Sequence, residues 1–198
     1  NEWVLLALDV LMLLGFGAVF LARANYEFII YAGIIVALGA LIFATRGKVD
    51  YPSYILWLLS GWALLHLAGG ALFIGGERLY GLILVDLSEQ YGIFRYDQLV
   101  HIYGFGVATL LIYELIRLRI DFRRHRVVFS ILIVMAGLGV GALNEIIEFI
   151  VVVLIPEAGV GGFENAMLDL VADLIGALIA LGLILKWELP AAEPPTAT

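Results

Sequence analysis

Long apolar runs, separated by short polar segments, are the feature that most constrains the fold of this chain. Each run is close to the roughly 20 residues that a helix needs to cross the hydrocarbon core of a bilayer. The chain is 63% hydrophobic and its mean hydropathy is +1.05, whereas soluble domains are nearer half apolar. The sequence therefore predicts an all-α polytopic integral membrane protein, a six-helix transmembrane bundle forming a single domain over residues 1–186. Its helices are expected at approximately 3–22, 27–45, 53–75, 97–118, 127–155 and 166–186.

The remaining segments are too polar or too irregular to span. Residues 76–96 carry several charges around the apolar patch "LYGLILV", which predicts an interfacial or re-entrant segment between the third and fourth helices. Residues 187–198 include "ELPAAEPPTAT" and are expected to be a disordered tail. In the fifth run, "GLGVGALNE" supplies closely spaced glycines, either for a kink or for close helix packing. The first run is interpreted as a retained helix, because no basic residues precede it as they would in a signal peptide.

The lysines and arginines predict the orientation, since cytoplasmic loops are enriched in them. With a cytoplasmic N-terminus, the cytoplasmic side holds eight of these residues and the other side holds three. The stretch "RLRIDFRRHRV" contributes most, and we interpret it as a topology signal that could also contact anionic lipid. Both termini are therefore placed in the cytoplasm of a prokaryotic cell, with the chain in its inner membrane. The eight are Arg46, Lys48, Arg117, Arg119, Arg123, Arg124, Arg126 and Lys186, and the three are Arg23, Arg78 and Arg95.

Seven ionisable residues inside the predicted spans fall in the same half of the bilayer, whereas Asp9 and Glu114 lie near cytoplasmic helix ends. At about 1.5 Å of rise per residue, the seven lie within roughly 15 Å of the outer surface. They come from four helices that run in different directions, so a chance scatter is not expected to gather them. The residues are His66, Asp97, His101, Glu145, Glu148, Asp169 and Asp173.

The spacing of these residues predicts a shared polar site. Three pairs are separated by three or four positions, so that each pair lies on one helix face. Carboxylates that face one another repel unless a cation or protons compensate, and carboxylate–histidine sets on facing helices build di-iron and di-manganese sites. Zinc also accepts such ligands. The leading hypothesis is a divalent metal site (zinc, iron or manganese) with ligands drawn from these seven residues, in a membrane-embedded enzyme that acts on a lipid or envelope substrate. One carboxylate left over from the ligand set would act as general base toward a metal-bound water.

Two other interpretations use the same residues. In the first, the acids form the proton relay of a proton-coupled transporter, although no inverted repeat is visible in the sequence. In the second, the protein is a structural or partner subunit whose protonated acids only join helices, and His66 is a packing residue. The sequence does not decide among an enzyme, a transporter and a structural role.

Other classes of function lack support. A net charge of −7 and the absence of a basic stripe exclude nucleic acid as an expected partner, which leaves membrane lipids. The chain has no cysteine, and therefore no disulfide or thiolate chemistry. No P-loop, GxSxG or HExxH motif occurs. Protein partners and oligomeric state are not predicted.

Four motifs resemble a known family: "LHLAGG", "RYDQLVHIYGFG", "NEIIEF" and "ENAMLDLVADLIGALIAL". Their order and spacing over about residues 50–186 are similar to the bacterial inner-membrane family typified by YjdF, with a fainter likeness to VanZ-like membrane proteins. The resemblance implies the fold and the polar positions, but no reaction. Asn165 stands where many members have an aspartate, which would remove one charge from a metal site. The matching positions are His66, Asp97, His101, Glu145, Glu148 and Asp169.

Overall fold

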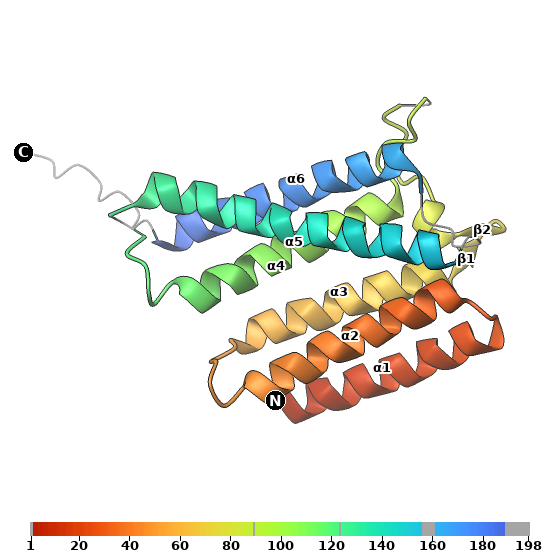
Figure 1. Cartoon of the computed structure of the whole chain (residues 1–198), viewed down its shortest axis with the longest axis horizontal. Helices are drawn as coiled ribbons and strands as arrows, with labels where there is room; N and C mark the ends of the chain where they lie inside the picture. The colour runs from red at the N-terminus through yellow and green to blue at the C-terminus, as the bar shows by residue number, and fades with distance from the viewer. Residues whose placement is uncertain (1, 89, 123, 156–160, 189–198) are drawn as a thin grey trace, which may run out of the picture.

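Six long helices make up most of the computed structural model, which describes residues 2–88, 90–122, 124–155 and 161–188 (Figure 1). All six are long and apolar enough to cross a membrane, which confirms the predicted all-α, six-helix membrane protein. They are α1 (Glu2–Ala22), α2 (Tyr26–Thr45), α3 (Ser53–Ala71), α4 (Tyr96–Ile116), α5 (Arg126–Leu154) and α6 (Phe163–Glu188).

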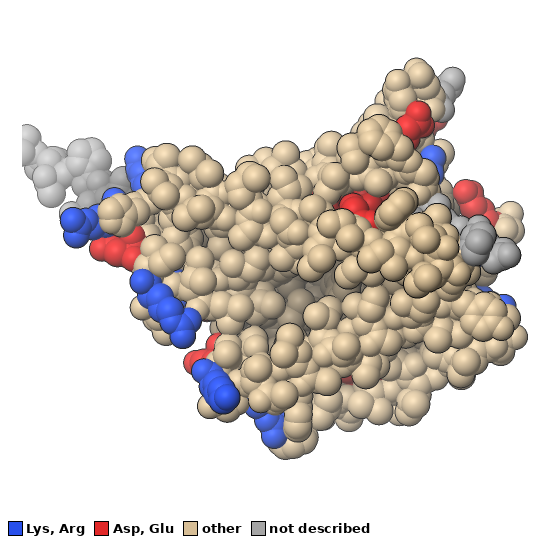
Figure 2. Space-filling model, viewed as in Figure 1, with Lys and Arg blue, Asp and Glu red and all other residues tan. Residues whose placement is uncertain are grey.

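Successive helices alternate in direction, so the bundle has two distinct ends (Figure 1). α4, α5 and α6 pack against one another, while α3 connects α4 to α1 and α2. At the end that we call the site end, α1, α3 and α5 finish and α2, α4 and α6 begin. Lys and Arg side chains gather at the opposite end, here called the arginine end (Figure 2). The predicted cytoplasmic residues flank helices at this end, and of them Arg123 lies outside the described residues.

The segment between α3 and α4 folds back against the site end. α3 stops at Ala71 rather than at the predicted residue 75, and strands β1 (Phe73–Ile74) and β2 (Glu77–Arg78) form a small antiparallel hairpin. Gly75 and Gly76 make its turn at φ of +61° and +90°, a conformation that glycine adopts without steric cost. The 3-10 helix η1 (Leu79–Gly81) then buries Leu79 against α4 residues. The apolar hairpin residues had extended the predicted helix.

The far end of α6 also differs from the prediction. Trp187 and Glu188 belong to α6, so the expected tail cannot begin at residue 187. The hydroxyl of Tyr113 donates a hydrogen bond to the Glu188 carboxylate, which fixes the end of α6 against α4. The rest of the expected tail, residues 189–198, lies outside the described residues.

Glycines set the close approach of α4 and α6. A Cβ built on Gly176 would overlap the carbonyl oxygen of Ile102 and lie 2.9 Å from the backbone nitrogen of Gly106. In α5, a Cβ on Gly141 would overlap the Asp173 carboxylate. α5 is one continuous helix. Of the two roles predicted for its glycines, Gly141 has that of close packing. These contacts bring the polar residues of α4, α5 and α6 together.

Candidate metal centre

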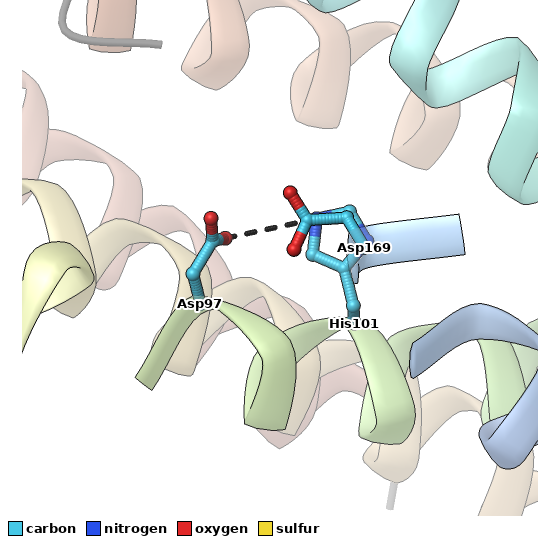
Figure 3. A group of neighbouring side chains, drawn as sticks. All are labelled: Asp97, His101 and Asp169. Atoms are coloured by element: carbon cyan, nitrogen blue, oxygen red, sulfur yellow. Dashed lines mark ion pairs between the residues drawn. The ribbon is translucent and has the colours of Figure 1, made fainter. Parts of the chain in front are cut away.

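His101 is the centre of a buried polar cluster at the site end. It lies one turn after Asp97 on α4, and its Nε2 is 3.7 Å from the Asp97 Oδ1 atom (Figure 3). On the other side of the ring, Nδ1 is 2.9 Å from Asp173 Oδ1 and 3.9 Å from Glu145 Oε1. The imidazole therefore faces carboxylates from α4, α5 and α6.

Local structure at the start of α4 positions this pair. The backbone nitrogen of Arg95 donates a hydrogen bond of 2.7 Å to the Gln98 side chain, which stabilises the first turn. The Tyr96 hydroxyl donates to the Leu65 carbonyl oxygen at 3.0 Å, joining α4 to α3. Asp97 and His101 then project from the same face because they are four residues apart.

Two sets of ligand atoms are close enough to hold a metal ion. The first is Asp97, His101 and Asp169, and the second is His101, Glu145 and Asp173; within each set the atoms lie within 4.8 Å of one another. Asp169 and Asp173 are fully buried, and His101 is 4% exposed. Five of the seven predicted ligands thus come together in the described structure.

The carboxylates of this cluster are incompletely paired. Buried oxygens of Glu145, Asp169 and Asp173 have no hydrogen-bond partner among the described residues. Leaving a buried polar atom unpaired typically costs about 1–3 kcal/mol, and more for a charged group. Three such atoms around one imidazole are the arrangement that a bound cation would satisfy.

Asp173 has a different geometric role from Asp169. When Nδ1–H of His101 donates to Asp173, the Nε2 lone pair is left on the side of Asp97, which shares a candidate ligand set with Asp169. Metal-binding histidines commonly donate their other ring nitrogen to a carboxylate, which fixes tautomer and orientation. Asp173 is thus placed to orient the ligand.

Asn165 joins two of the acids. Its side-chain amide donates to Asp97 Oδ2 at 3.3 Å and also to Asp169 Oδ2. An aspartate here would add a fourth negative charge beside these two carboxylates and the nearby Glu148. The Asn165 amide instead donates hydrogen bonds to Asp97 and Asp169. The cluster therefore carries less negative charge than it would with an aspartate at this position.

His66 belongs to neither candidate set. Its side chain is nevertheless buried, with 9% of its surface exposed. Its ring contacts four aromatic rings at centroid distances of 5.4–5.6 Å, those of Phe28, Tyr31, Trp62 and Tyr80. Nδ1 is 2.5 Å from the hydroxyl of Tyr80 on η1. Burial raises the pKa of Tyr80 well above 10, so the phenol keeps its proton and can donate it to this nitrogen.

An open cavity of about 330 Å³ lies beside the cluster. His66, Asp97, Glu148 and Asn165 line it, together with residues of the segment after α3. Glu148 accepts a hydrogen bond of 2.8 Å from Asn144 and faces this cavity rather than either candidate set. The two predicted ligands outside the sets therefore both lie on the cavity wall.

Three residues of the site were not predicted from sequence. Asn165 stands out in the sequence only as a departure from the family pattern, and no sequence prediction covers Tyr31 or Tyr80. Tyr31 follows the start of α2 by five residues, so the same depth count would have placed it near the cluster. For Tyr80 the sequence carries no comparable signal, because its place depends on how η1 folds back.

One comparison with known proteins gives a match. The predicted membrane protein family DUF2238 matches residues 3–189, nearly the whole chain. No curated protein and no solved structure gives a significant match. The match agrees with the six apolar helices and with a polytopic architecture. The chain therefore belongs to the DUF2238 family of predicted membrane proteins.

Proposed function

We propose that the protein binds a divalent cation at the site end, through Asp97, Nε2 of His101 and Asp169. The observation that carries the proposal is the buried imidazole held by Asp173 and facing two further carboxylates within 4.8 Å. Glu145, 3.9 Å from the opposite ring nitrogen, completes the acidic surroundings. Zinc, manganese and iron all accept this mixture of nitrogen and oxygen ligands.

Charge balance supports a cation. Four carboxylates surround His101, and two unit charges 4.8 Å apart repel by about 3 kcal/mol at an effective dielectric constant near 20. Charged residues within spans are expensive unless they are paired or serve a site. A divalent ion offsets this repulsion and supplies a partner for the unpaired oxygen of Asp169, the one of the three acids that belongs to the proposed ligand set.

The chemistry that follows is hydrolysis or group transfer on a lipid or envelope substrate. A bound divalent ion would act there as a Lewis acid toward a carbonyl or phosphoryl oxygen. Glu148 is outside the proposed ligand set and on the cavity wall, so it is the carboxylate available to accept a proton. The protein is then a membrane-embedded, metal-dependent enzyme.

A proton relay is the second candidate, and one contact favours it. His101 faces a carboxylate from each ring nitrogen, Asp97 from Nε2 and Asp173 from Nδ1, so the imidazole could pass a proton between them. A transporter or a purely structural subunit would use these groups without metal. Metal content separates these functions from the first.

The proposed setting is the prokaryotic inner membrane with both termini in the cytoplasm. The arginine end would then face the cytoplasm, as the excess of Lys and Arg there supports. The site would open outward, toward lipid headgroups. The motifs around His66, Asp97 and Asp169 further support a YjdF-like protein within the family.

Elemental analysis of the purified protein in detergent tests the metal. We expect close to one zinc, manganese or iron per chain in the wild type, and a loss of most of it in Asp169→Asn, which keeps the side-chain volume. Glu114→Gln is the matched control, because Glu114 pairs with Arg117 at 2.6 Å at the arginine end. Wild-type protein that stays metal-free after incubation with each ion would refute the proposal and leave the relay and the structural role.

A further inference from the structure

We propose that the cavity beside the cluster binds the phosphate of a phosphate ester, with Arg95 and Tyr31 as its anchors. The proposal deepens the proposed function and rests on it for the reaction, because it names the class of substrate. The phosphate could belong to a lipid headgroup or to a soluble ester. The volume of the cavity, about 330 Å³, is at the small end for ligand sites, which suits a headgroup rather than an acyl chain.

Arg95 supplies the cationic anchor. Its side chain is half-buried and lines the cavity. Nε donates to the Gly92 carbonyl oxygen at 3.1 Å, and none of the described carboxylates forms an ion pair with the guanidinium. Arg78, also on the wall, is already paired with Glu27 at 3.2 Å. Arg95 is therefore the arginine with donors left for an anion.

The loop before α4 is built to hold that guanidinium. Gly92 has φ of +55°, and a Cβ built there would lie 2.5 Å from Nη2 of Arg95. Any larger residue would be strained in this conformation and would displace the arginine. Planar guanidinium donors match phosphate oxygens well when they are fixed in place.

Tyr31 supplies a second, independent sign of a ligand. The residue is 7% exposed and lines the cavity, and its hydroxyl has no hydrogen-bond partner among the described residues. A buried hydroxyl normally finds a partner. The ring is held against Phe28 and His66, so the hydroxyl is presented by a rigid wall.

The carboxylates of the cavity wall make binding of an anion depend on the proposed metal. Four carboxylates line the cavity: Glu27 is paired with Arg78, while Glu77, Asp97 and Glu148 would repel an anion. The cation proposed at Asp97, His101 and Asp169 offsets that repulsion. A phosphate between this cation and Arg95 has positive charge on both sides, as in other phosphoryl-transfer sites.

Isothermal titration calorimetry of the full chain in detergent, with manganese present, tests the proposal. The probes are dihexanoyl phosphatidic acid, glycerol 3-phosphate and inorganic phosphate. We expect Arg95→Gln to weaken binding of the preferred phosphate ester about tenfold or more, with metal content unchanged. Gly92→Ala should do the same, and Tyr31→Phe should weaken it less. Arg119→Gln makes the same charge change at the arginine end and should have no effect.

The outcomes separate this proposal from the metal site. Normal metal content with no ester binding, or with equal binding by wild type and Arg95→Gln, would overturn the anion site alone. Ester binding that depends on Arg95, in a protein that takes up none of the ions on incubation, would support the anion site and overturn the metal. Binding of the lipid probe alone identifies a headgroup, and equal binding of glycerol 3-phosphate identifies a soluble ester.

Discussion

Replacing Gly176 with alanine tests the contact that brings the two halves of the cluster together. The new methyl group would overlap the Ile102 carbonyl oxygen of α4 and crowd the backbone nitrogen of Gly106. These are backbone atoms, so no rotamer change relieves the clash and α6 must move away from α4. Ile102 follows His101 directly, and Asp173 precedes Gly176 by less than a turn, so the movement separates the cluster.

The magnitude follows from two opposing terms. Overpacking a tight contact costs about 1–3 kcal/mol, and an immovable backbone obstacle puts this case at the upper end. The change from glycine to alanine in a helix returns up to about 1 kcal/mol. We therefore expect Gly176→Ala to lower the free energy of unfolding by about 2 kcal/mol.

Gly182→Ala is the matched control in the same helix, because a Cβ there meets nothing within 4 Å. It should be neutral or stabilise by up to about 1 kcal/mol. Unfolding by dodecyl sulfate in mixed micelles, followed by circular dichroism, measures both variants. Metal content should fall only in Gly176→Ala. Equal stability of the two variants would refute the packing of α4 on α6 described above.

Three further results are expected. Gly137→Ala should destabilise the protein by about 1–3 kcal/mol in the same unfolding assay, because its methyl group would overlap the Thr109 hydroxyl of α4 and crowd Ala177 of α6. Gly139→Ala, with nothing within 4 Å, should not. Tyr80→Phe leaves Nδ1 of His66 buried without its partner and should cost about 1–3 kcal/mol, measured likewise. Wild-type protein in metal at a hundredfold excess over Kd should melt about 5–10 °C higher than the same protein after a chelator has removed the metal. The melting temperature of Asp169→Asn should not respond to the chelator.

The helices were predictable because hydropathy alone identifies segments long enough to span. Their ends were less so. Phe73 and Ile74 are apolar yet exposed in the hairpin, and a hydropathy count cannot separate them from the end of α3. The paired glycines at 75 and 76 marked the turn, but glycine is also common inside membrane helices.

Depth along each helix was predictable from sequence, whereas rotation about the helix axis was not. Counting residues from the helix ends placed Asp97, His101, Glu145, Asp169 and Asp173 at similar depth, and the structure brings them together. α3 is apolar on nearly every side, so no polar face indicates which way a residue such as His66 points. Only the packing of aromatic rings around it decides that.

The α4–α6 contact also bears on how the chain is assembled in a membrane. α6 follows α4 along the chain and is synthesised after it, and its first half carries two aspartates, a residue type that costs about 2.5–3.5 kcal/mol at the centre of an isolated membrane helix. Both are fully buried once α6 lies against α4. Asp173 then accepts a hydrogen bond from His101, a group already in place before α6 emerges. The glycine contact between α6 and α4 therefore brings Asp173 to its partner, and a chain truncated before α6 would leave His101 without that carboxylate.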